Sequence, residues 1–101
     1  MDIIEERREN EVLLLLKGRL DINASERLEK EVTHWLSLEV VKKLILDMEN
    51  VEYISSAAIR VLLYAQKNLH KDHELIIRSP SKFCRQVFEV TGADIFLKIV
   101  M

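Results

Sequence analysis

Two adjacent serines, Ser55 and Ser56, stand where an apolar, strand-like segment gives way to a helix-like one. Unpaired backbone N–H groups and the positive end of the helix dipole meet at the start of a helix. A serine there caps the helix by accepting a backbone hydrogen bond. A phosphate would also be tolerated there, because helix N-termini bind anions. The residues alone favour the cap, which is the ordinary role of such serines, over a phosphorylation site.

A phosphate on this pair would add about 1.5 to 2 negative charges at neutral pH. If the loops cluster as an alternating strand-helix topology suggests, several acidic residues lie near the serines: Asp21, Asp47, Glu49 and Glu52. Phosphorylation would then deepen a negative patch. It would expel a partner that docks at this end of the protein.

The remaining polar residues form no recognisable catalytic, cofactor or metal site. The serines lack a G-x-S-x-G setting, and Gly18 and Gly92 are isolated, so no glycine-rich phosphate loop exists. His70 and His73 flank Asp72, but no third metal ligand is suggested nearby. We expect both histidines in solvent at a helix end. The protein is therefore expected to be a non-enzyme without cofactor or metal.

The composition indicates one small globular domain, residues 1–101, with 49% hydrophobic and 32% charged residues. A net charge of −2 gives no sign of binding to nucleic acid or to an acidic membrane. Apolar runs such as Val12–Leu16 are too short to span a bilayer, and the N-terminus has no signal-peptide core. The single cysteine, Cys84, excludes an internal disulfide, and we expect it to fill apolar space on a helix. A cytoplasmic monomer is the expectation.

Strand-like and helix-like segments alternate along the chain. Short apolar runs predict strands, and apolar residues at i, i+4 and i+7 predict helices. The first predicted strand begins at Ile3, and the next two cover Val12–Leu16 and Val41–Leu46. A fourth lies around Leu75–Ile77, and the last segment, IFLKIV, is either a strand or a helical turn. The predicted helices run from Ala24 to about Leu36, from near Ser56 onward, and from SPSK to Gly92.

Connections and buried faces can be predicted in more detail. Glu9–Glu11 is a polar turn, and Asp47–Glu52 reads as a short acidic connection. The unbroken apolar run Val12–Leu16 is typical of a strand covered on both faces. Asp21 or Asn23 is expected to cap the first helix.

The third helix offers two cap candidates, Ser79 and Ser81. Phe83, Val87 and Val90 are expected to share its inner face. The resulting order, β-β-α-β-α-β-α-(β), predicts an α/β protein whose four- or five-stranded mixed sheet packs against α-helices.

Three stretches in this order resemble a known family over essentially the whole chain: LKGRLDINASERLEKEV, KKLILDMENVEYISSAAIRVLL and SPSKFCRQVFEVTGADIFLKI. They resemble STAS domains, in particular bacterial anti-sigma factor antagonists. The resemblance implies a STAS-type fold and a partner-switching role in transcription regulation. In the family, the unphosphorylated antagonist binds an anti-sigma factor that is also a serine kinase, which frees a sigma factor. Phosphorylation blocks that binding, and a phosphatase resets the switch.

Carried across position by position, the resemblance places the phosphate acceptor on Ser56, with Ser55 a weaker candidate. The family's first-loop and strand-end aspartates match Asp21 and Asp47. Ser55 stands where the family has an aspartate, and Ala58 stands where it has a glycine. Because alanine favours a helix over glycine by about 1 kcal/mol, the helix start should be stiffer here.

The expected docking surface combines the loop end with the exposed side of the second helix: Asp21, Asn23, Ser55, Ser56, Arg60, Tyr64 and Lys67. The alternative for the last three is an ordinary solvated helix face. The two departures from the family pattern also leave a second function open. The chain would then be a constitutive STAS interaction subunit without a phospho-switch, for example in a lipid-transport ATPase complex.

Overall fold

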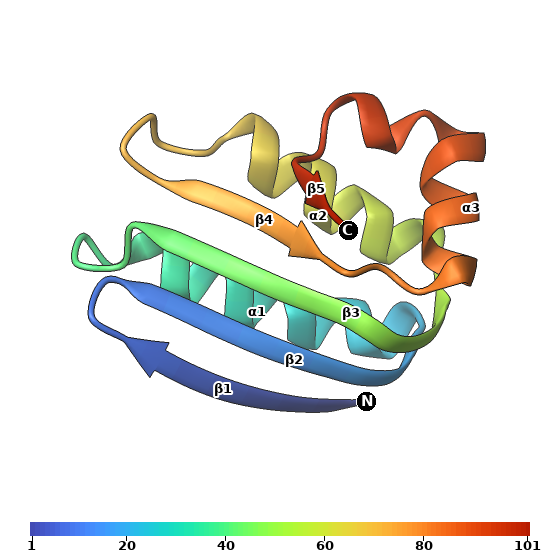
Figure 1. Ribbon diagram of the computed structural model, residues 1–101, viewed down its shortest axis with the longest axis horizontal. Coiled ribbons are helices and arrows are strands. Elements are labelled where there is room, and N and C mark those ends of the chain that lie inside the picture. The colour runs from blue at the N-terminus through green and yellow to red at the C-terminus, as the bar shows by residue number, and fades with distance from the viewer.

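Five strands form one mixed sheet in the order β1-β2-β3-β4-β5 (Figure 1). The computed structural model describes residues 1–101. Its strands are β1 (Asp2–Arg8), β2 (Glu11–Leu20), β3 (Lys43–Ile54), β4 (Glu74–Arg78) and β5 (Ile99–Val100). Its helices are α1 (Ile22–Ser37), α2 (Ser56–Lys67), α3 (Lys82–Thr91) and a short 3-10 turn, η1 (Ala93–Ile95). The predicted fold class and element order are confirmed.

Strands β1 and β2 form an antiparallel hairpin, whereas β2, β3, β4 and β5 are parallel neighbours. The crossovers that join the parallel strands are the three α-helices. Figure 1 shows α1 and α2 side by side behind the sheet, and α3 beyond the end of β4 and beside the last part of β3. The two helices that follow β2 and β3 therefore begin at the same edge of the sheet.

Strand β2 is buried on one face only, which corrects the expectation of a strand covered on both faces. Val12, Leu14 and Leu16 are fully buried, whereas Leu13 and Leu15 are half-buried. Successive side chains of a strand point to opposite faces, so the helices cover only the first set. Leu44 and Leu46 of β3 complete this covered face and are also fully buried.

The acidic segment Asp47–Glu52 is part of β3 and not a connection, as the sequence had suggested. Strand β3 continues beside β2 as far as the pair Leu20 and Ile54. Met48 and Val51 within the segment are buried, which ties it to the core. The turn before α2 is consequently very short, because the strand ends at Ile54 and the helix begins at Ser56.

The caps of α1 and α3 resolve the alternatives left by the sequence. The Asp21 side chain accepts a hydrogen bond from the Ala24 N–H, while Asn23 lies inside α1. Ser81, not Ser79, caps α3 by accepting from the Cys84 N–H. Gly92 ends α3 in the left-handed conformation with φ 77°, as a helix-terminal glycine is expected to do.

The inner face of α3 differs from the predicted one. Cys84 and Phe88 are fully buried, whereas Val90 is 87% exposed, Phe83 is 41% exposed and Val87 is half-buried. The helix is turned so that the Ser81 hydroxyl donates to the Val51 carbonyl of β3 at 2.7 Å. That bond fixes the start of α3 on the sheet and directs Cys84 and Phe88 inward.

Candidate functional site

The N-termini of α1 and α2 lie next to each other at the carboxyl ends of β2 and β3. The Ser55 backbone N–H donates to the Leu20 carbonyl at 2.9 Å, which joins the two strand ends. Asp21 follows Leu20 directly and caps α1. Two helix ends with unpaired N–H groups and positive dipoles thus meet at one edge, and Asp21 supplies a negative charge between strand and helix.

Ser55 is the structural cap of α2. Its hydroxyl accepts a hydrogen bond from the Ala58 N–H at 3.2 Å, and its carbonyl accepts from the Ile59 N–H at 3.1 Å. The residue is only 6% exposed. Ser55 therefore holds the start of α2 against the core and has little surface to offer a second protein.

Ser56 has the opposite setting. It is the first residue of α2 and is exposed, while the cap position behind it is already occupied by Ser55. Its hydroxyl lies at the positive end of the helix, where an added anion is stabilised by the dipole. The two serines that are equivalent in sequence are thus distinct in structure.

Ser55→Ala should lower the free energy of unfolding by about 1 kcal/mol, because the Ala58 N–H would lose its acceptor. Ser56→Ala should change it by less than about 0.5 kcal/mol, as surface substitutions usually do. Equilibrium unfolding in urea measures both values. Equal losses for the two variants would show that the cap is not confined to Ser55.

Asp47 does not belong to this end of the sheet, so it is not part of the acidic patch expected around the serines. Its Oδ2 accepts from the Nε and Nη2 of Arg78 at 2.9 and 2.8 Å, and its Oδ1 accepts from the Glu49 N–H. Asp47 is 7% exposed. About 25 Å of extended strand separates it from Ser55. The carboxylate is a paired group within the sheet and cannot reinforce a charge at Ser56.

Four exposed residues of α2 continue from the serine along one side of the helix. Ser56, Arg60, Tyr64 and Lys67 follow one another at i, i+4, i+8 and i+11, and Tyr64 is 70% exposed. These four residues are called the α2 stripe below. The structure therefore places four of the predicted docking residues on one side of α2, while Asp21 caps the neighbouring α1 and Asn23 is the second residue of that helix.

Residues of α1 that the sequence did not single out face the α2 stripe. Ile22, Glu26 and Glu29 line a hollow together with Arg60 and Tyr64. Ile22 is 67% exposed, which is unusual for a large apolar side chain. The sequence offered no signal for this exposure, because helical periodicity predicts burial for an apolar residue and not a place in solvent.

A second set of residues at the same edge was also missed. The Arg19 guanidinium lies 4.4 Å from the centre of the Tyr53 ring, and that ring lies 5.8 Å from the ring of Phe83. Arg19 and Tyr53 are neighbours in the pairing of β2 with β3. The contact between Arg19 and Tyr53 depends on this register, which the sequence alone does not give.

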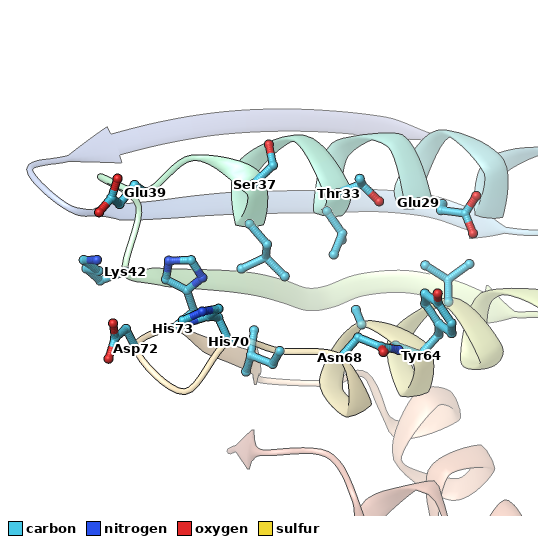
Figure 2. Close-up of a pocket in the computed structure, with 15 residues that line it drawn as sticks. Glu29, Thr33, Ser37, Glu39, Lys42, Tyr64, Asn68, His70, Asp72 and His73 are labelled. Atoms are coloured by element: carbon cyan, nitrogen blue, oxygen red, sulfur yellow. The ribbon is translucent and has the colours of Figure 1, made fainter.

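His70 and His73 follow the end of α2, as predicted, with their ring centres 5.8 Å apart. No group of three histidine, cysteine, aspartate or glutamate side chains is placed to hold a metal ion. Both rings line a larger hollow between α1 and α2, drawn in Figure 2.

Burial raises the pKa of the Cys84 thiol above its ordinary value, and this cysteine fills core space as expected.

The match to known families agrees with this geometry. A family model described as "STAS domain" covers residues 2–101. This chain belongs to the STAS domain family. None of the helices of this STAS domain combines the length and apolar character that a membrane crossing requires.

Several relatives of this STAS domain have been described. BtrV of Bordetella bronchiseptica, to which the role of anti-sigma factor antagonist is ascribed, is 30% identical over 82 residues, which cover 80% of this chain and 70% of BtrV. An anti-sigma factor antagonist from Mycobacterium paratuberculosis superposes with a TM-score of 0.87 at 17% identity, over 98% of this chain and 84% of that one. The unphosphorylated form of SpoIIAA, also an anti-sigma factor antagonist, gives 0.81 at 20% identity, over 99% and 89%. The phosphorylated form of Bacillus SpoIIAA gives 0.75 at 20% identity, over 99% and 92%.

Proposed function

We propose that this STAS domain is an anti-sigma factor antagonist that is switched by phosphorylation of Ser56. The unphosphorylated form binds an anti-sigma factor with serine kinase activity and frees a sigma factor. The kinase transfers a phosphate to the Ser56 hydroxyl, and the phosphorylated form no longer binds. A phosphatase removes the phosphate and resets the cycle.

The observation that carries this proposal is the division of roles between the two serines. Ser55 is buried and caps α2, whereas Ser56 is exposed at the first position of the helix. A kinase can reach the Ser56 hydroxyl without unfolding the helix start. The identity to BtrV and the likeness to SpoIIAA, which has been solved in phosphorylated and unphosphorylated forms, support the same role.

The expected effect of the phosphate is on binding and not on the fold. At Ser56 the phosphate lies at the positive end of α2, so the helix itself tolerates the charge. A partner that covers this position would have to remove about 1.5 to 2 negative charges from water. Unless the partner places a cation opposite the phosphate, that desolvation opposes docking, and Arg60, one turn away, is the nearest cation of α2.

The departures from the family pattern are compatible with such a switch. Ser55 takes the aspartate's position and still supplies a side-chain acceptor to the Ala58 N–H. Ala58 is fully buried beneath the helix start, so its methyl group packs inside the protein and leaves the surface around Ser56 unchanged. Both substitutions act below the proposed docking surface.

Phosphate transfer tests this proposal directly. The anti-sigma factor kinases of the source organism should be purified and incubated with this chain and ATP, and the product analysed by intact-mass and peptide mass spectrometry. Wild type and Ser55→Ala should each gain one phosphate on Ser56, and Ser56→Ala should gain none. A phosphate on Ser55, or none on wild type with any of these kinases, would contradict the proposal. The second result would favour a constitutive STAS interaction subunit.

A further inference from the structure

A long groove runs between α1 and α2, beginning beside Ser56. Its first part, of about 400 Å³, is lined by residues including Ile22, Ala57 and Arg60. Its second part, of about 580 Å³, extends to the histidines after α2. Both parts share Glu29, Val61 and Tyr64, so they adjoin. The groove therefore starts at the proposed switch and follows both helices towards their C-terminal ends.

The floor of the groove is aliphatic. Val32 and Leu36 come from α1, Val61 and Ala65 come from α2, and Leu69 follows the end of α2. In each helix the two positions are four residues apart, so each helix contributes one short apolar row. Exposed Ile22 and Tyr64 extend the apolar surface at the end near Ser56.

The two walls of the groove carry different charges (Figure 2). The α1 helix lines it with two carboxylates, Glu26 and Glu29, and the segment after the helix adds Glu39 and Lys42. The α2 wall presents Arg60, Tyr64 and Asn68, and its one carboxylate, Asp72, lies beyond the end of the helix. None of these charged groups takes part in an ion pair of the protein. An occupant with complementary charges can therefore pair with them directly.

We propose that this groove binds an amphipathic helix of the anti-sigma factor kinase, with a basic flank along α1 and an acidic residue at Arg60. The stretch of α1 that lines it, Ile22–Ser37, is about 22 Å long at 1.5 Å per residue. A partner helix of about 15 residues matches this length. Its apolar side chains at i, i+3, i+4 and i+7 would lie on the two aliphatic rows.

This inference rests on the proposed function, because it assigns the groove to the same kinase. It adds a reason why one phosphate at Ser56 is sufficient as a switch. Ala57, the next residue, lines the groove entrance. A phosphate on Ser56 would lie beside the end of the bound helix and one turn from Arg60, where it would compete with the partner's acidic residue for that guanidinium.

Two matched pairs of variants test the groove by titration against the kinase that phosphorylates Ser56. Glu29→Lys should weaken binding at least tenfold, whereas Glu31→Lys, on the same helix but outside the groove, should stay within about threefold. Thr33→Trp fills the groove and should also weaken binding at least tenfold. His34→Trp, at the next position and away from the groove, serves as its control. Circular dichroism verifies that each variant is folded.

Cross-linking tests that the occupant is a helix. Thr33→Cys places a reactive thiol in the groove, while the native Cys84 is buried and its pKa is raised. A thiol-to-amine cross-linker in the kinase complex should then reach partner residues spaced by three or four. Cross-links to an extended segment of the kinase would contradict the proposal that the occupant is a helix. The proposal would also be contradicted if the groove held a second copy of this chain or a small molecule, and if Thr33→Trp abolished that binding. If the kinase binds wild type and both groove variants equally, the groove inference fails alone; if it does not bind wild type, the proposed function fails as well.

Discussion

Replacing Ser56 with aspartate should weaken binding of the cognate anti-sigma factor kinase by about 100-fold, whereas alanine at this position should leave the affinity within about threefold. A charge enclosed in an interface without a counter-charge costs several kcal/mol, and about 2.8 kcal/mol corresponds to 100-fold. Alanine removes only a hydroxyl from the start of the α2 stripe. Titration calorimetry with the purified kinase measures both affinities.

Two controls separate this effect from instability and from general charge repulsion. The first turn of α2 contains no acidic residue, so Ser56→Asp should stabilise the helix by about 0.3 to 1 kcal/mol through the dipole. Its melting temperature should therefore not fall. Gln86→Glu adds the same charge on the exposed side of α3 and should bind like wild type. If Ser56→Asp binds as tightly as Gln86→Glu, the charge switch is wrong.

Phe88→Ala should be the most destabilising of the substitutions considered, with a loss of about 3 to 5 kcal/mol in the free energy of unfolding. The Phe88 side chain is fully buried between α3 and the rest of the core, so its removal leaves a large cavity. Val90→Ala on the same helix should cost less than about 0.5 kcal/mol, because Val90 is 87% exposed. Urea unfolding compares the two variants. If Val90→Ala lost more free energy of unfolding than Phe88→Ala, the buried face of α3 would be the one predicted from the sequence pattern.

The face of α3 illustrates why burial could not be predicted fully from the sequence. Apolar residues occur at Phe83, Cys84, Val87, Phe88 and Val90, and they define two overlapping helical faces. Helical periodicity alone cannot choose between them. The choice depends on how α3 packs on the sheet, where the Ser81 hydroxyl bonds the Val51 carbonyl of a residue 30 positions away in the chain.

Strand β3 shows the same dependence on distant partners. Its helix-facing residues were recognisable from their apolar run, but Asp47–Glu52 looked like a loop because acidic residues are rare in central strands. The structure accommodates Asp47 because Arg78 of the neighbouring strand neutralises it. That pairing depends on the register between β3 and β4, which local sequence does not specify.

The candidate site was more predictable than these details, because its elements are local. A strand that ends in polar residues before a helix locates Ser55, Ser56 and Asp21 from pattern alone. The sequence could not decide which serine is the cap, since both residues carry the same hydroxyl. The burial of Ser55, whose backbone N–H bonds the Leu20 carbonyl, and the exposure of Ser56 make that distinction in three dimensions. The groove was not predictable either, because it requires α1 and α2 to lie side by side.

The most direct test of the switch is the affinity of one wild-type preparation for its kinase before and after phosphorylation. The phosphorylated chain should bind at least about 100-fold more weakly, and treatment with a serine phosphatase should restore the original dissociation constant. The unfolding free energy should change little between the two forms, because the phosphate lies at the exposed start of α2. Equal dissociation constants for the two forms would contradict the account, because Ser56 would then carry a modification that the interface does not sense.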